Sequence, residues 1–241
     1  MFAYRIGCAG WPVPTANKSE FPAEGSNLQR YAARFSATEI NSSFHRPHRP
    51  STYERWAASV PPDFRFSVKI PKAVTHERRL VDTDTLLDAF LAEATGLGAR
   101  LACLLVQLPP KLAYDGAVGE RFFADLRSSY DGAVALEPRH ASWFTNDVDE
   151  RLRAHRIARV AADPARVPEA AEPAGWDDLV YIRLHGSPDM YYSSYDEAYL
   201  DRLAARLRQA ATRASSVWCI FDNTGRGAAA PNALSLLERL A

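Results

Sequence analysis

The residues of this chain that could transfer protons or bind an anion recur in short polar motifs directly after apolar runs. Glu137 is followed by Arg139 and His140, and Arg183 is followed by His185. Since side chains two positions apart on a β-strand point to the same side, Glu137 shares a face with Arg139, and Arg183 with His185. A carboxylate, an imidazole and guanidinium groups on one surface are what proton transfer beside a negatively charged substrate requires.

Similar motifs follow the other apolar runs, and together they define two groups of candidate site residues. The candidate catalytic residues are Glu137, His185, Glu39 and His140. Either glutamate could act as general base and either histidine as general acid, because such chemistry needs two titratable groups with different pKa values. The candidate substrate-binding residues are Trp11, Asn41, Lys69, His76, Gln107, Arg139, Arg183 and Asn223.

Each of these residues also has a structural interpretation. A neighbouring arginine favours the ionised carboxylate, so Glu137 and Arg139 could form an ion pair that only stabilises the fold. A single histidine at a strand end is more often structural than catalytic. Four of the six histidines, His45, His76, His140 and His185, lie at or just after strand ends, and together they are harder to explain in this way, because burying polar and charged groups costs free energy. We predict that Lys69, Glu137, Arg139 and His185 converge on one anion-binding pocket.

The elements that position these motifs are eight short runs with strand-like patterns. Helical spacing separates them, most clearly from Leu86 to Ala94 and from Leu200 to Ala211. Ser51 and Glu54 match a capping box, and Asp196 precedes a helical run. The expected strands are Ala3–Gly7, Thr38–Ser42, Arg65–Ile70, Leu101–Gln107, Ala133–Glu137, Ala158–Ala162, Leu179–Leu184 and Val217–Asp222.

Alternating strands and helices indicate an α/β fold in which parallel strands are joined by right-handed crossovers. Eight such units in 241 residues favour a closed (β/α)8 TIM-type barrel, with the first strand beside the last, over an open doubly wound sheet. We expect one domain over residues 1–241. The segment from Cys8 to Gly25 is long for a strand-to-helix connection, so we expect it to cover part of the barrel mouth with Trp11.

The motifs, taken in order, resemble those of the YecE-like family, also called domain of unknown function 72. The segments that carry the resemblance are Ile6–Trp11, Glu39–His45, Phe64–Phe66 with Lys69, Pro71, Thr75 and His76, Gln107–Pro110, Glu137–His140 with Ser142 and Trp143, and Arg183–Gly186. The resemblance spans nearly the whole chain and implies a TIM-type barrel, but no established reaction. The chain departs from the family pattern at Cys8, where Thr or Ser is usual, and at Asp222, where the pattern has Asn.

Three functions are compatible with these residues. The first is a hydrolase or lyase acting on an anionic, phosphate-bearing substrate, since residues 45–79 carry eight Lys or Arg and Arg226 lies between Gly225 and Gly227 after the last strand. The second is a nucleic-acid-binding protein or a metal-dependent endonuclease-like barrel, because aromatic residues interleave with the basic ones. The third is a metal-dependent sugar isomerase. No metal ligand or cofactor is assigned, because no diagnostic ligand spacing is present.

Composition supports an ordinary globular protein. The chain has 47% hydrophobic residues, 24% charged residues and no net charge, which excludes a strongly basic nucleic-acid-binding chain. The three cysteines lie in strand-like runs without a C-x-x-C spacing, and no apolar run is long enough to span a membrane. We expect a cytoplasmic protein with a small anionic substrate or a nucleic acid as partner, and no membrane association.

Overall fold

The computed structural model describes residues 4–241 and has a mixed α/β fold with two largely parallel sheets. The first sheet contains, in spatial order, β1 (Tyr4–Cys8), β10 (Ser216–Phe221), β9 (Leu179–Leu184) and β7 (Ala161–Asp163). The second contains β2 (Ala37–Ile40), β3 (Arg65–Lys69), β4 (Leu101–Gln107), β5 (Ala133–Glu137), β6 (Ile157–Arg159) and β8 (Ala174–Gly175). Every strand pairing is parallel except that of β6 with β8.

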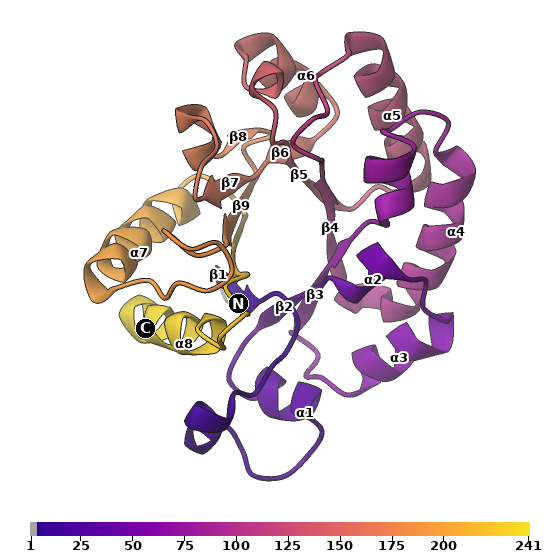
Figure 1. Ribbon diagram of the computed structural model, residues 1–241. Helices are drawn as coiled ribbons and strands as arrows, with labels where there is room; N and C mark the ends of the chain where they lie inside the picture. Colours follow the sequence, from indigo (N-terminus) through magenta and orange to yellow (C-terminus); the bar gives the residue numbers. More distant parts are fainter. Residues whose placement is uncertain (1–3) are drawn as a thin grey trace.

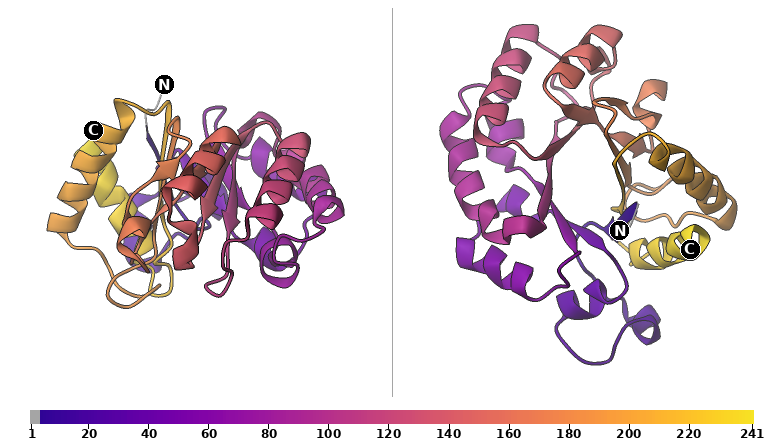
Figure 2. Two further views of the ribbon diagram at one scale, coloured as in Figure 1. Left: turned by 90° about the horizontal axis from the view of Figure 1, so that it is seen from above. Right: turned by 180° about the vertical axis from the view of Figure 1, so that it is seen from behind.

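Helices cover the outer faces of both sheets, while the strands curve around a common axis (Figure 1). The α-helices are α1 (Asn27–Ala32), α2 (Ser42–His45), α3 (Pro50–Ala58), α4 (Asp84–Ala94), α5 (Gly116–Ser129), α6 (Asn146–Ala154), α7 (Glu197–Ala211) and α8 (Ala229–Leu240). Shorter helical turns are η1 (Thr15–Glu20), η2 (Ala73–Glu77), η3 (Thr95–Arg100), η4 (Ala141–Trp143) and η5 (Pro168–Ala171). Figure 2 shows α7 and α8, in gold and yellow, on the opposite side of the strands from the purple and magenta helices.

The two sheets meet between β1 and β2. The N–H of Gly10 donates a hydrogen bond to the carbonyl of Glu39 at 2.7 Å. The buried hydroxyl of Tyr31 accepts a hydrogen bond from the Cys8 N–H at 2.7 Å and donates one to the Ala37 carbonyl at 3.0 Å. A side chain therefore replaces part of the backbone ladder between these two strands.

The sheets meet a second time at the sixth expected strand. This strand is divided into β6 and β7 by Val160, whose N–H donates to the carbonyl of Leu136 on β5 at 2.9 Å. β6 pairs with β5 in the second sheet, whereas β7 pairs with β9 in the first. One continuous segment therefore belongs to both sheets.

Side chains on the inner faces of both sheets pack together. On β9, Leu179, Tyr181 and Arg183 point inward by their two-residue period. Tyr181 stacks on Trp218 of β10 with ring centroids 5.7 Å apart, and both rings are buried with Leu105 of β4. The inner core is thus apolar near the N-terminal ends of the strands and becomes polar toward their C-terminal ends.

Several expectations are confirmed and others need correction. All eight expected strands are present within one or two residues of the expected bounds, although Ala3 lies outside the described residues. Hydrogen bonding forms two sheets rather than the one closed sheet expected. Between β7 and β9 the chain forms only η5 and β8, so the alternation of strand and α-helix fails there.

The helix caps were predicted with mixed success. Asp196 caps α7 by accepting a hydrogen bond from the Tyr199 N–H, as its position suggests. The capping box at Ser51 is wrong, because α3 begins at Pro50, a favoured first helical residue, and Ser51 is therefore already inside the helix. None of the helices in residues 4–241 combines the length and apolar composition that crossing a lipid bilayer takes.

Candidate functional site at the C-terminal ends of the strands

The inward-facing position at the C-terminal end of most strands carries a polar or charged side chain. Because the strands run in parallel, these ends lie at the same side of the molecule, the side at which α/β proteins commonly bind ligands. The residues in these positions are Glu39 (β2), Lys69 (β3), Gln107 (β4), Glu137 (β5), Arg183 (β9) and Asp222 (directly after β10), and all are buried.

Arg183 is the centre of this group and is fully buried. Its Nε and Nη2 donate to the two carboxylate oxygens of Glu39 at 3.0 and 2.6 Å. Nη1 donates to Glu137 at 2.6 Å, and Nη2 also donates to Asp222 at 3.0 Å. We call Glu39, Glu137, Arg183, His185 and Asp222 the Arg183 cluster. Most guanidinium N–H groups of Arg183 are used within the protein, which leaves little for a substrate.

His185 lies between two carboxylates of the Arg183 cluster. Its Nδ1 is 3.0 Å from Oδ2 of Asp222, and its Nε2 is 3.2 Å from Oε1 of Glu137. Burial opposes protonation, but the charge of Glu137 and the hydrogen bonds to both carboxylates outweigh it and raise the pKa of His185. As an imidazolium, the ring donates one N–H to each carboxylate.

The oxygen atoms of Glu137 are already occupied. Gln107 Nε2 lies 3.0 Å from both, and Arg139 Nε donates to Oε1 at 3.1 Å. Burial opposes ionisation, but the charges of Arg183 and His185 outweigh it and hold the pKa of Glu137 well below its ordinary value. Glu137 is therefore an ionised carboxylate that fixes the side chains of Gln107, Arg139 and Arg183 through hydrogen bonds.

Asp222 offers the most accessible carboxylate in the Arg183 cluster. Its side chain is 13% exposed, against 2% for Glu137 and 0% for Glu39. Oδ2 accepts hydrogen bonds from Arg183 and His185, while the described residues provide no hydrogen-bond donor for Oδ1. Burial raises and Arg183 and His185 lower the pKa of Asp222, with a net decrease that keeps it ionised.

Lys69 is a buried cation of a different kind. Its Nζ donates to Oε1 of Gln107 at 2.7 Å and lies 4.0 Å from the centre of the Phe44 ring. No carboxylate oxygen of residues 4–241 forms an ion pair with it. Burial, reinforced by the charge of Arg183, lowers the pKa of Lys69 to about 8, although the nearby carboxylates act in the opposite direction.

Arg139 and His76 share the region around Lys69. The Arg139 side chain is 14% exposed, and only its Nε has a hydrogen bond among the described residues. Burial, together with the charges of Lys69 and Arg139, lowers the pKa of His76. Lys69, Arg139 and His76 thus keep N–H groups or a ring nitrogen without a hydrogen-bond partner among the described residues. Most oxygens of the neighbouring carboxylates, by contrast, already accept hydrogen bonds.

The loop between β9 and α7, residues 185–196, covers part of this region. Tyr191 lies edge-on to the His185 ring at 5.9 Å, and its N–H donates to the His185 carbonyl. The cavity lined by Glu137, Arg139, His185 and Met190 measures about 10 Å³, which is room for about one water molecule. The sequence analysis did not identify this loop as part of the site.

Four other predicted residues lie outside these contacts. Nδ1 of His140 accepts a hydrogen bond from the Ser142 N–H at the start of η4, which is a structural role. The Asn223 amide donates to the Ser193 carbonyl and to Asn232, and so attaches the loop after β9 to α8. Trp11 packs edge-to-face on Trp56 at 5.1 Å, and Oδ1 of Asn41 is buried without a hydrogen-bond partner among the described residues. The catalytic role of His140 and the substrate-binding roles of Trp11, Asn41 and Asn223 stay predictions.

Three side chains of the site, Tyr181, Phe44 and Asp222, are not among the site residues predicted from the sequence. Tyr181 donates to Glu39 at 2.8 Å and lies 2.9 Å from the Ser67 hydroxyl, which completes the buried surroundings of Glu39. Phe44 provides the ring beneath the Lys69 ammonium. The two-residue period from Arg183 back to Tyr181 is the signal that could have identified Tyr181.

The basic residues of segment 45–79 do not form one surface. Arg65 begins β3 and donates to the carbonyls of Pro62 and Phe64, at the N-terminal end of the strands. Arg46 and Arg49 are exposed beside α2 and α3. The candidate site therefore contains fewer positive charges than the grouping of basic residues in the sequence suggests.

Neither a metal centre nor an activated thiol is visible in residues 4–241. No group of three or more His, Cys, Asp or Glu side chains in this part of the chain is placed to hold a metal ion. The oxygens of Glu39 and Glu137 accept hydrogen bonds from Arg183 instead. Cys8 is fully buried, and burial raises the pKa of its thiol to about 12, so this thiol is not activated.

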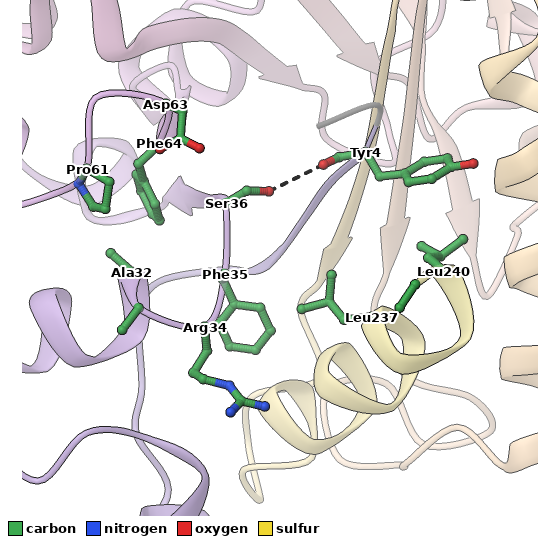
Figure 3. A pocket seen from close by; sticks show the side chains of 12 residues that line it. Tyr4, Ala32, Arg34, Phe35, Ser36, Pro61, Asp63, Phe64, Leu237 and Leu240 are labelled. Carbon is green, nitrogen blue, oxygen red and sulfur yellow. Dashed lines mark hydrogen bonds between the residues drawn. The ribbon is translucent and has the colours of Figure 1, made fainter. Parts of the chain in front are cut away.

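A separate pocket of about 440 Å³ lies at the opposite ends of the strands (Figure 3). Tyr4, Ser36 and Phe64, at or just before the starts of β1, β2 and β3, line it together with Leu237 and Leu240 of α8. Ser36 donates a hydrogen bond to the Tyr4 carbonyl across this pocket. Its lining is mainly apolar and contains no paired acid and base, so the chemistry is concentrated at the C-terminal ends.

Comparison with known sequences places the chain among proteins without an assigned reaction. The sequence model of the family described as "Protein of unknown function DUF72" matches residues 5–241. The chain is 26% identical to the UPF0759 protein YunF of Bacillus subtilis, over 98% of this chain and 94% of YunF. It is 28% identical to the UPF0759 protein YecE of Escherichia coli, over 61% of this chain and 56% of YecE.

Solved structures agree with the fold. A DUF72 family protein from Thermotoga maritima superposes with a TM-score of 0.84 at 26% sequence identity, covering 98% of both chains. A DUF72 family protein from Enterococcus faecalis gives a TM-score of 0.83 at 20% identity, over 98% of this chain and 95% of that one. The arrangement of sheets and helices is therefore shared with experimentally determined structures.

Proposed function

The chain belongs to the DUF72 family, and we propose that it is an enzyme of hydrolase or lyase type that binds a small anionic substrate at the C-terminal ends of its strands. The substrate carries a carboxylate or a phosphate group. One observation carries the proposal: the buried ammonium of Lys69 has no carboxylate partner in residues 4–241, although three carboxylates of the Arg183 cluster lie nearby.

Charge balance supports anion binding. With Lys69 and His185 protonated, the site contains four cationic groups and three carboxylates, and Arg183 holds all three carboxylates. The surplus positive charge is found on Lys69 and Arg139, which keep unused N–H groups. An anion that bridges these two side chains would replace the water that they otherwise need.

The acid–base roles follow from accessibility. Asp222 has an oxygen without a donor in the described chain and is the carboxylate that can reach a substrate, so we assign it the role of general base. His185 and Arg183 keep it ionised. Glu39 and Glu137 then have positioning roles, because their oxygens are bonded to Arg183 and they are almost completely buried.

The test is anion binding measured by calorimetry and thermal shift with inorganic phosphate and with pyruvate, at constant ionic strength. A hydrogen bond to a charged group contributes about 1.5–3 kcal/mol, so Lys69→Met and Arg139→Gln should each weaken binding by roughly 10- to 100-fold. The exposed Lys72 pairs with Glu77, and Lys72→Met is the matched control that should bind as the wild type does. Equal affinity in the wild type and Lys69→Met would refute the anion site.

We also propose that the mixed α/β fold is a single (β/α)8-type barrel that spans the chain. Supporting this are the hydrogen bonds between β1 and β2 and the segment shared by β6 and β7. Hydrogen exchange tests it: the amides of Cys8 and Gly10 should be as well protected as those of the central strands. Rapid exchange at both amides would mean that the two sheets are not joined at β1 and β2.

A further inference from the structure

Lys69 differs from the other lysines of the chain. The sequence contains four, Lys18, Lys69, Lys72 and Lys111, and the other three are exposed. Lys69 is 8% exposed and contacts a neutral amide oxygen and an aromatic ring. Lysine is rarely buried without an ionic partner, since desolvation of the ammonium is costly.

We propose that Lys69 is a catalytic nucleophile whose amine forms an imine with an aldehyde or ketone that carries a carboxylate or phosphate group. This proposal rests on the proposed function and narrows it to the lyase type. Amines become nucleophilic at neutral pH when they are desolvated and feel the charge of another cation. Lys69 is 8% exposed, and the charge of Arg183 acts on it. Its lowered pKa, about 8, agrees with this geometry.

Gln107 positions the amine for attack. Its Oε1 accepts one N–H of Lys69, while its Nε2 is held by both oxygens of Glu137. The amide therefore cannot reverse its orientation without losing these bonds. This arrangement fixes Nζ at the polar end of β3 without giving it a carboxylate, which would stabilise the unreactive ammonium.

The reaction balances as a condensation. Lys69 first releases one proton, and the lone pair of Nζ then attacks the carbonyl carbon while the C=O π electrons move to oxygen, which takes up a proton. The attacking nitrogen then releases its second proton to give a neutral carbinolamine, and protonation of the carbinolamine hydroxyl group expels water and leaves a protonated imine. Asp222, whose charge acts on Lys69, can accept a proton from the substrate, and Arg139 holds its anionic group. The imine then accepts the electrons released when a bond next to it breaks.

The experiment is reductive trapping. The intact protein is incubated with pyruvate or glyoxylate in the presence of cyanoborohydride, and the products are analysed by intact mass and peptide mapping. We expect one adduct at Lys69 in the wild type and in Lys72→Arg, and none at this position in Lys69→Arg or Lys69→Met. Arginine keeps the positive charge but forms no imine, so Lys69→Arg separates charge from nucleophilicity.

Two results would overturn the inference. One is an adduct spread evenly over the exposed lysines, and the other is no adduct at all under conditions that modify free lysine. If pyruvate still binds in a Lys69-dependent way but no adduct forms, the imine is refuted and the proposed anion site stands. If Lys69→Met changes neither binding nor trapping, both proposals fail.

Discussion

Replacing Arg183 by methionine tests the central claim about the site, that one guanidinium forms ion pairs with three buried carboxylates. The change removes four hydrogen bonds, two to Glu39 and one each to Glu137 and Asp222. Glu137 keeps Gln107, Arg139 and His185. Glu39 keeps only the Tyr181 hydroxyl and is fully buried, so it becomes the uncompensated charge.

Breaking a buried ion pair from one side costs about 3–5 kcal/mol. For a chain of this size, 1 kcal/mol corresponds to roughly 2–4 °C in Tm, so Arg183→Met should lower Tm by roughly 6–20 °C. Glu39→Gln should also destabilise the wild type, by about 2–4 kcal/mol, because it leaves Arg183 with too little negative charge. In the Arg183→Met background the same substitution should be stabilising, since it removes the orphan charge while keeping the side-chain shape.

Urea unfolding of the wild type, both single variants and the double variant measures this change of sign directly. If Arg183→Met does not accumulate as folded protein, Arg183→Lys replaces it in the cycle, because it retains one charge and loses the bidentate contact with Glu39. The reasoning is refuted if Glu39→Gln costs the same in both backgrounds, or if Arg183→Met stays within about 1 kcal/mol of the wild type.

Three further predictions concern single side chains. His185→Gln should lower the free energy of unfolding by about 1–3 kcal/mol below pH 6.5 and by progressively less as pH rises, because a raised pKa stabilises the folded state only while the ring is protonated. Urea unfolding at pH 6 and pH 9 checks this, and an equal loss at both pH values would contradict it. Tyr31→Phe should cost about 2–3 kcal/mol, since it leaves the Cys8 N–H and the Ala37 carbonyl without partners, whereas Tyr192→Phe at an exposed position should cost nothing measurable in the same urea titration. Lys69→Met should change the stability of the ligand-free protein by less than about 1 kcal/mol, because the substitution loses the hydrogen bond to Gln107 but no longer buries a charge. A loss above about 2 kcal/mol in differential scanning calorimetry would disprove this account.

Strand positions and the identity of the site-forming motifs could be predicted from the sequence. Runs such as Leu101–Gln107 and Leu179–Leu184 match β4 and β9 completely, because a short, mainly apolar run marks a strand that is buried on both faces. Such runs also predict that Glu137, Arg183 and Lys69 lie at one end of the strands. The motif series also predicted the DUF72 family, which the match over residues 5–241 confirms.

The contacts among these residues were decided only by the tertiary structure. Arg183 and Glu39 are 144 positions apart, and their pairing depends on which strands face each other across the axis, which a local pattern does not contain. Arg183 was therefore predicted to be a substrate ligand, whereas its donors are largely occupied by carboxylates. It paired Glu137 with Arg139, and the structure adds Arg183, His185 and Gln107 to that ion pair.

The solvent exposure of the site residues, like their contacts, could not be predicted from the sequence. Lys69, Glu39 and Asp222 occupy similar positions at their strand ends, yet their exposure to solvent and the number of their partners differ. These quantities depend on packing by distant side chains such as Phe44 and Tyr181. The sequence by itself determined which residues lie at the C-terminal ends of the strands, because alternation is a property of each strand alone. Only the fold decided which of them are buried counterions and which remain free to bind, because burial and charge pairing arise between strands.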